Sequence, residues 1–505
     1  MIIQSLRDVV REHRERLAII DGTRQITYGE LLERIQAVRE WLRSSLDLKP
    51  GDVVAAAFDN SWQYVACFFA VSELGCIFTP CNPQWRAAEL RPLARRLGFR
   101  GAVIEPRLNP EWNRILDLIP APGLLTVDQA PDKSGPTCDR GLAIPEGTGE
   151  NAPALYVSTS GSTGVPRVVV RSHRSLIANA RNVARSLDFG PGLRFLAVVP
   201  FHFFYGFCNS MLTPLLAGAT VVMMPKFSPA ACAELMQRER VDVLYGSPFI
   251  YGSIVDHVPD PVLLSSLRLC FSSGGRTPAG VIERWRTRFG LAIRQNYGMS
   301  EMGMIAIQRS ESTPASPAGT CVGEPGSGVE VVVLGAGGRR LEAGEIGELA
   351  VRSPSLMSGY LGEPELSRSR FHDGYFRTGD LGYVDSAGFV YLTGRMGRVM
   401  NIAGVKVDPV EVERAVEMLA GVASCHVDAI PNGTGGEVIR ARVLPRDGFQ
   451  VTRRHVIEQC RQQLAEYKFP RVIEFLQESP ISIAGKIPKN SGIDHQRPDQ
   501  AVDSS

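Results

Sequence analysis

The stretch Tyr156–Arg167 reads YVSTSGSTGVPR and continues an apolar run that begins at Ala154. This run predicts a buried strand, because short apolar segments bounded by turn residues are typical of covered sheets. Beyond it, two glycines lie among Ser and Thr hydroxyls, with a proline and a cation at the end. Glycines let a backbone approach a ligand closely, and exposed amides and hydroxyls surround phosphate oxygens. The stretch predicts a phosphate-binding loop, with a Ser/Gly-rich turn as the alternative. No G-K-[ST] follows the second glycine, so this is not a Walker loop.

Further along the chain, short β-branched runs alternate with helix-like segments. The runs are 195–199, 219–224, 241–245, 267–271 and 291–295. Between two of them, the segment 281–289 has a helical pattern, and Gly290 supplies its stop. This alternation predicts an α/β fold of parallel sheets flanked by helices.

The residue pattern changes twice after these runs. From about Val329, short strands with Gly-rich turns predict a β-rich subdomain. The segment from Asp408 then has a helix-start pattern, with Asp as cap and Pro in the first turn. Apolar residues continue at helical spacing as far as Leu419, and Gly421 can end this helix. We therefore expect a large domain over 1–394 and a small, mobile α+β domain over 395–505.

Composition excludes several classes of protein. The chain has 505 residues, 44% hydrophobic and 21% charged, with a net charge of +2, which gives no general electrostatic case for nucleic acid. We see no apolar run long enough for an integral membrane segment, and the N-terminus is charged too early for a secretory signal. The ten cysteines are scattered without a CxxC pair, which favours a reducing cytoplasm.

One further motif follows a predicted strand. The segment Gln295–Glu301, QNYGMSE, presents Tyr297 and Glu301 at the carboxyl edge of a sheet, where open α/β sheets bind ligands. A carboxylate beside a triphosphate suits a hard cation, so we expect Glu301 to bind Mg²⁺. Tyr297 can lie against a base ring. An ordinary turn is the alternative for this motif.

Three weaker motifs complete the set. In PFHFFYG, His202 stands among aromatic residues, and a packed histidine is the ordinary reading. In SSGGRTP, Gly274 and Gly275 can let an acyl chain pass along bare backbone, or form a simple turn. In RTGDL, the two oxygens of the Asp380 carboxylate can accept from both ribose hydroxyls.

These motifs stand in an order that resembles the adenylate-forming enzymes: acyl- and aryl-CoA synthetases, peptide-synthetase adenylation domains and beetle luciferases. A terminal segment, SPISIAGKIPK, completes the resemblance and makes Lys486 the expected catalytic lysine. The family usually has Lys-Gly where this chain has Arg167 and Val168, and a small residue where it has Arg276.

The resemblance implies a role for each matching residue. Lys486, Glu301 and Thr159 would be catalytic, with Glu301 and Thr159 as metal ligands. His202, Gly274 and Gly275 would line the acid pocket, and Gly397 would be the hinge. ATP would be bound by Thr159, Ser160, Gly161, Ser162, Thr163, Gly164, Arg167, Tyr297, Asp380, Arg395 and Lys486.

The resemblance also implies a reaction. A small carboxylic acid would be activated with ATP and Mg²⁺ as an acyl-adenylate and then joined to coenzyme A. The alternative acceptor is the phosphopantetheine arm of an acyl carrier protein in natural-product biosynthesis. A non-catalytic nucleotide-binding relative is a further alternative, and the fold alone does not exclude a luciferase-like oxygenase.

Overall fold

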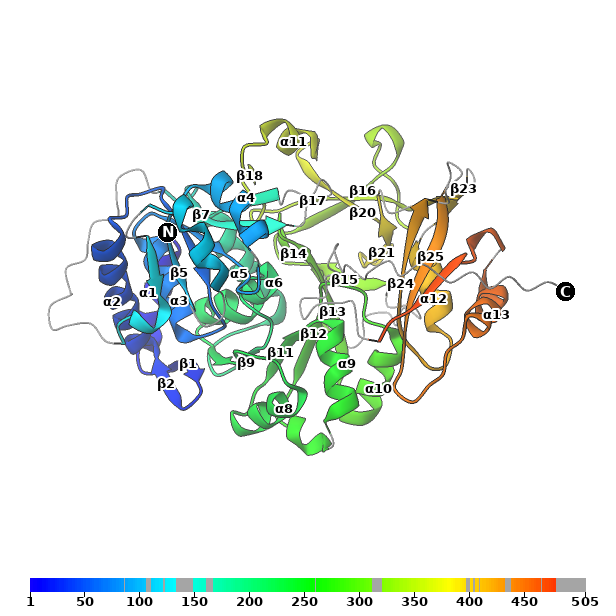
Figure 1. Ribbon diagram of the computed structural model, residues 1–505, viewed down its shortest axis with the longest axis horizontal. Helices are drawn as coiled ribbons and strands as arrows, with labels where there is room; N and C mark the ends of the chain where they lie inside the picture. Colours follow the sequence, from blue (N-terminus) through cyan, green and yellow to red (C-terminus); the bar gives the residue numbers. More distant parts are fainter. Residues whose placement is uncertain are drawn as a thin grey trace.

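The computed structural model describes residues 1–85, 87–105, 110–120, 123–132, 149–159, 167–258, 260–310, 320–396, 400–402, 405–407, 409–431, 437–464 and 466–477. Its α/β architecture has a large N-terminal part built on two extended sheets and a small C-terminal domain (Figure 1). The predicted fold class is therefore confirmed. No helix within those ranges is long and apolar enough to cross a membrane.

The longer sheet runs through the middle of the molecule and into the β-rich region. Its strands β9 to β13 pair in parallel, and the strands after β13 pair antiparallel. In spatial order they are β16 (Glu330–Leu334), β17 (Gly347–Arg352), β20 (Tyr375–Val384), β21 (Val390–Arg395), β15 (Cys321–Pro325), β14 (Gly303–Ile307), β13 (Ile293–Met299), β12 (Leu269–Ser272), β11 (Val243–Gly246), β9 (Arg194–Ala197), β10 (Thr220–Met223), β1 (Leu17–Asp21) and β2 (Arg24–Thr27), with β19 (Phe371–His372) beside β20.

The second sheet contains the strand that the opening stretch predicts. In spatial order it consists of β18 (Gly359–Tyr360), β8 (Arg167–Ser172), β7 (Pro153–Thr159), β4 (Ile77–Pro80), β3 (Val53–Ala57), β5 (Phe99–Ile104) and β6 (Leu124–Thr126). Ala154 to Val157 are buried within β7, which confirms the predicted strand.

Helices cover both sheets. They are α1 (Ile2–His13), α2 (Tyr28–Leu46), α3 (Trp62–Glu73), α4 (Ala87–Leu97), α5 (His173–Leu187), α6 (Phe204–Gly206), a π-helix (Phe207–Leu212), α7 (Thr213–Leu216), α8 (Pro229–Arg238), α9 (Pro248–His257), α10 (Ala279–Phe289) and α11 (Pro364–Ser369). The short 3-10 helices are η1 (Pro110–Leu118), η2 (Val127–Gln129), η4 (Pro261–Leu264), η5 (Ala336–Gly338) and η6 (Glu466–Lys468). Gly290 ends α10 at φ 68°, a left-handed conformation that glycine adopts without a Cβ clash.

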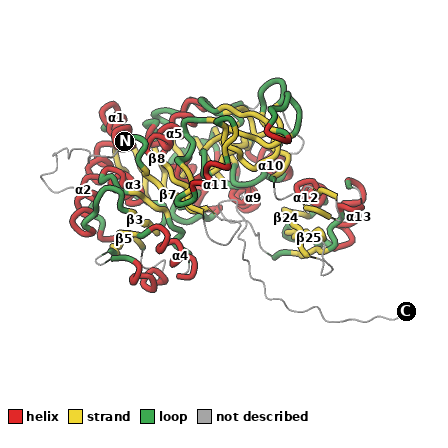
Figure 2. The backbone as a smooth tube through the Cα atoms, turned by 90° about the horizontal axis from the view of Figure 1, so that it is seen from above, coloured by secondary structure: helices red, strands yellow, loops and turns green. Residues whose placement is uncertain are grey.

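The small domain has its own sheet and core. The strands β24 (Val422–Pro431), β25 (Glu437–Pro445) and β26 (Val472–Phe475) pack against α12 (Pro409–Glu417) and α13 (Arg453–Gln463), and a hairpin of β22 (Met400–Ile402) and β23 (Val405–Val407) precedes them. Figure 2 shows this domain beside α10. The sequence pattern predicts that α12 reaches Gly421, but the helix ends at Glu417 and the chain turns before β24.

Candidate active site

Glu301 lies where the two sheets meet, in the turn between β13 and β14. Its Oε1 accepts a hydrogen bond of 2.9 Å from the hydroxyl of Tyr360, on β18 of the other sheet. Its backbone carbonyl accepts from the amide of Met357 at 2.7 Å. The carboxylate predicted as a metal ligand is therefore held at the junction of the two sheets, and its neighbour Tyr360 belongs to none of the sequence motifs.

Tyr297 and Asp380 come from distant motifs and are hydrogen-bonded to each other. The Tyr297 hydroxyl donates to Asp380 Oδ2 at 2.6 Å, and Arg395 Nε lies 3.4 Å from Asp380 Oδ1. Burial raises the pKa of Asp380, and the nearby charge of Glu301 adds to this effect, while Arg395 and Tyr297 oppose it. The three residues predicted to contact the nucleoside are thus brought together.

A buried carboxylate, Glu348 on β17, supports this cluster. It accepts from the amide of Gly379 at 3.1 Å and from Arg377 Nε at 2.7 Å. The Thr378 hydroxyl also accepts from the amide of Asp380 at 3.0 Å. These contacts fix the RTGD turn. The sequence showed only that Glu348 belongs to the GELAVRS strand. A strand position does not indicate that the carboxylate will bind the RTGD turn.

The phosphate loop is described only at its two ends. Ser160, Gly161, Ser162, Thr163 and Gly164 lie outside the described residues. At the entry, the Thr159 hydroxyl donates to the carbonyl of Arg167 at 3.3 Å, and the two residues pair across β7 and β8. The loop therefore begins and ends at one strand pair.

Arg167, at the exit of the loop, lies between an acidic and an aromatic side chain. Its Nε is 4.0 Å from Glu363 Oε2, and its guanidinium carbon is 6.0 Å from the centre of the Tyr360 ring. Glu363 also pairs with Arg96, at 2.5 Å. Tyr360 therefore adjoins both the Arg167 side chain and the Glu301 carboxylate.

His202 and the glycine pair lie beyond the carboxyl ends of the parallel strands. The imidazole of His202 is 4.2 Å from the ring of Phe203, and burial lowers its pKa to about 3, so it is neutral at ordinary pH. Tyr205 donates to the carbonyls of Phe271 and Gly246, at 3.2 Å and 3.4 Å. This strand-end aromatic group, consisting of His202, Phe203 and Tyr205, is partly exposed.

The glycine pair forms an open turn after β12. Gly274 and Gly275 are both exposed, and Gly274 has φ 86°. The turn is closed beneath them by a hydrogen bond of 2.7 Å from the Thr277 hydroxyl to that of Ser272. Bare backbone is therefore presented near the strand ends, and the role of this pair in the acid pocket stays a prediction.

The expected catalytic lysine and the expected hinge are not covered. Lys486 and Gly397 lie outside the described residues, so both remain predictions. In the described ranges no group of three or more His, Cys, Asp or Glu is arranged to hold a metal by itself. A single carboxylate at the junction fits Mg²⁺, because this ion is commonly held by one or two carboxylates together with substrate phosphates.

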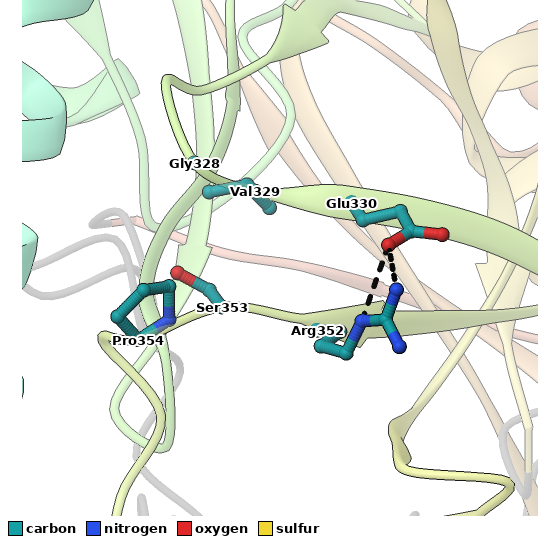
Figure 3. A pocket seen from close by; sticks show the side chains of 6 residues that line it. All are labelled: Gly328, Val329, Glu330, Arg352, Ser353 and Pro354. Carbon is teal, nitrogen blue, oxygen red and sulfur yellow. Dashed lines mark hydrogen bonds and ion pairs between the residues drawn. The ribbon is translucent and has the colours of Figure 1, made fainter.

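A separate hollow opens on the β-rich region (Figure 3). It has a volume of about 580 Å³ and is lined by Gly328, Val329, Glu330, Arg352, Ser353 and Pro354. Glu330 and Arg352 form an ion pair across its wall. None of the predicted site residues lines this hollow.

Comparison with known proteins places this arrangement in a family. The chain matches the family described as AMP-binding enzyme over residues 6–361, and its C-terminal domain over residues 411–486. It is 32% identical over 479 residues to a feruloyl-CoA synthase of Amycolatopsis sp, covering 94% of both chains. It is 28% identical over 479 residues to an indoleacetate–CoA ligase of Aromatoleum aromaticum, covering 92% of both.

Solved structures agree with the sequence matches. The ATP-bound structure of MatB from Rhodopseudomonas palustris has a TM-score of 0.84 at 26% identity and covers 96% of both chains. The apo structure of MatB has a TM-score of 0.74, with 97% of both chains covered. The chain belongs to the AMP-binding enzyme family and is an AMP-forming acid–thiol ligase.

Proposed function

We propose that this ligase activates an aromatic carboxylic acid and transfers the acyl group to coenzyme A. The observation that carries the choice of acid is the strand-end aromatic group, whose Tyr205 bonds the carbonyl of Phe271 shortly before the open Gly274–Gly275 turn. Aromatic walls favour a flat ring through offset and edge contacts. The similarity to a feruloyl-CoA synthase and an indoleacetate–CoA ligase supports the same class of acid.

The first half-reaction requires the acid and the triphosphate to be held in line. An oxygen of the substrate carboxylate attacks the α-phosphorus, the bond to the bridging oxygen breaks, and pyrophosphate leaves. Residues 159–164 and Arg167 would surround the departing phosphates, while Asp380 accepts from the ribose hydroxyls and Tyr297 lies beside the base. Such chemistry depends mainly on positioning and on charge stabilisation.

Two groups would carry the charge stabilisation. Lys486 would contact the substrate carboxylate and the α-phosphate. Glu301, with Thr159, would hold Mg²⁺, which offsets the negative charge that moves onto pyrophosphate. We assign the metal role to Glu301 because it lies at the junction between the sheet that carries the phosphate loop and the Tyr297–Asp380 cluster.

The second half-reaction requires a thiol. Its sulfur attacks the acyl carbonyl carbon, and AMP leaves. We favour coenzyme A as the acceptor, because the relatives named above are CoA ligases. A carrier-protein arm ends in the same thiol, so the test is whether free CoA alone supports AMP release.

The change between the half-reactions would involve the small domain. We propose a boundary between residues 394 and 395 and a hinge at Gly397, where glycine permits a large change in φ and ψ. We also propose a cytoplasmic location, where ATP and CoA are supplied. It is supported by the described cysteines, which are all buried and unpaired.

Hydroxamate trapping of acyl-adenylates tests the proposed acid. Hydroxycinnamic, benzoic and arylacetic acids are compared with fatty acids and small aliphatic acids at equal concentration. We expect the aromatic acids to give the highest rates of trapping. Faster trapping of a fatty or small acid would overturn the substrate class, and no trapping with any acid would overturn the activity itself.

A further inference from the structure

Arg171 is a buried cation beside the site, and the proposed function assigns it no role. It lies on β8, four residues beyond Arg167, and its side chain is fully buried. Burial lowers its pKa to about 10, so it stays charged at neutral pH. Within the described ranges it forms no ion pair, although buried charges usually have a counter-charge in contact, and the Glu301 charge acts on it only as a neighbour that opposes the fall of its pKa. Its surroundings must therefore satisfy it in another way.

Main-chain carbonyls take the place of a counter-ion. Arg171 Nη1 donates to the carbonyl of Ser300 at 2.8 Å, and Nη2 donates to the carbonyl of Ser355 at 2.7 Å. A longer contact of 3.5 Å joins Nη2 to the carbonyl of Met302. The guanidinium thus contacts the residues on both sides of Glu301.

The guanidinium is itself held rigidly. Its Nε donates to the hydroxyl of Ser175 at 3.1 Å, and its central carbon lies 4.7 Å from the centre of the Phe204 ring. A planar guanidinium that is bonded and stacked in this way has one orientation, which a flexible ammonium cannot reproduce.

The backbone of Glu301 is fixed from the same side of the molecule. The amide of Met357 donates to the Glu301 carbonyl at 2.7 Å. The amide of Ser358 donates to the carbonyl of Val170, next to Arg171, at 2.9 Å. Three successive carbonyls, from residues 300 to 302, are therefore bound by β8 and the chain that pairs with it. The Glu301 carboxylate takes no part in these backbone contacts, so it can accept from Tyr360 and bind a ligand.

We propose that Arg171 is a positioning residue, which holds residues 300–302 so that the Glu301 carboxylate is aimed at the metal of bound Mg·ATP. This inference rests on the proposed metal role of Glu301. Arg171 touches neither the metal nor the nucleotide. Residues that orient a metal ligand from behind typically change metal affinity or activity by about 10- to 100-fold when mutated.

Arg171→Lys is the principal test, because lysine keeps the charge but lacks the planar fork whose two terminal nitrogens bond Ser300 and Ser355 separately. We measure binding of a non-hydrolysable ATP analogue at increasing Mg²⁺ and in EDTA, which requires no acid substrate. The half-saturating Mg²⁺ concentration should rise about 10-fold, and binding in EDTA should be unchanged. Arg39→Lys is the matched control, since Arg39 is also buried but pairs with Glu73 at 2.9 Å.

A double mutant distinguishes failure of the positioning role of Arg171 from failure of the proposed metal role of Glu301. Arg171→Lys should add little to Glu301→Gln if it acts through Glu301, whereas independent effects would multiply. Multiplying effects, or a lower melting temperature with unchanged Mg²⁺ dependence, would overturn the positioning role. An Mg²⁺ dependence unaffected by Glu301→Gln would instead overturn the metal role and this inference with it. If Arg171→Lys does not fold, Ser175→Ala, which removes the Nε acceptor, should give a smaller shift in the same direction, and no shift would refute the inference.

Discussion

Arg276, in the turn after β12, forms an ion pair with Glu417 at the end of α12 and so joins the large domain to the small one. Both side chains are mostly buried, at 20% and 13% exposure. Burial raises the pKa of the Glu417 carboxyl, and Arg276 opposes that rise. The arginine that departs from the family pattern therefore has a structural partner in the other domain.

We predict that Arg276→Ala loosens this domain arrangement. A hydrogen bond to a charged group is worth about 1.5–3 kcal/mol, which corresponds to a change of about 10- to 150-fold in the ratio of two arrangements. Distance measurements between labels on the two domains should show a broader distribution. Arg286→Ala, at an exposed position on α10, is the control. An unchanged distribution would mean that other contacts hold the domains.

A second prediction concerns Arg167. Arg167→Ala should raise KM for ATP more than it lowers kcat, because a cation at the loop mostly helps to capture the triphosphate. Arg167→Lys should retain activity. Neither change should greatly alter thermal stability, since Glu363 keeps Arg96 as a partner. A collapse of kcat with unchanged KM would instead place Arg167 in the chemical step.

Local patterns predicted the elements well, because their signals lie within a few residues. The strand at Ala154–Val157 and the helix that ends at Gly290 are examples. The end of α12 was wrong, since apolar spacing continues to Leu419 while the helix stops at Glu417. The cause is tertiary: Leu419 still packs against the core, but from a turn.

The supporting residues of the site could not be predicted in the same way. Arg171 is 129 residues from Ser300, Tyr360 is 59 from Glu301, and Arg276 is 141 from Glu417. A single sequence carries no local signal for such pairs. The motif residues were found because each belongs to a short local pattern, but the side chains that orient them depend on how the two sheets meet.

The third prediction is a pH dependence that arises from His202. Its pKa is about 3 in the folded protein and ordinarily about 6.5 in an unfolded chain, so only the unfolded state binds a proton at mildly acidic pH. Stability from this group is complete above pH 6.5 and is lost as pH falls towards 3. The free energy of unfolding should fall between pH 7 and pH 5 in both proteins. The fall should be about 1–2 kcal/mol smaller in His202→Gln than in the wild type.

Urea unfolding at pH 5, 6 and 7 measures this difference. His173 also has a pKa lowered by burial, to about 4, so the variant should retain part of the acid sensitivity. His257→Gln, at an exposed position, should follow the wild-type profile. Identical profiles for the wild type and His202→Gln would show that His202 becomes protonated without unfolding.

A fourth prediction tests the ribose contact. Asp380→Asn should raise KM for ATP by about 10-fold or more, because a charge-assisted hydrogen bond is worth about 1.5–3 kcal/mol. It should have little effect with 2′,3′-dideoxy-ATP, which lacks the ribose hydroxyls. Asp373→Asn, in an exposed turn, is the control. Equal losses with both nucleotides would indicate that Asp380 serves only to hold Tyr297 and Arg395.

The last prediction separates the half-reactions at Lys486. Lys486→Ala should slow acyl-adenylate formation by about 10²- to 10³-fold, as expected for the loss of one preorganised charge contact in the transition state. Thioester formation from a synthetic acyl-adenylate should be nearly unchanged, because the attack of the carboxylate on the α-phosphorus is then already complete. Pyrophosphate exchange measures the first step, and CoA-dependent AMP release from the adenylate measures the second. Lys489→Ala, three residues further along the same segment, controls for loss of charge near the terminus. If both steps fell equally, Lys486 would act in both domain arrangements or in folding, and its assignment to the first step would be wrong.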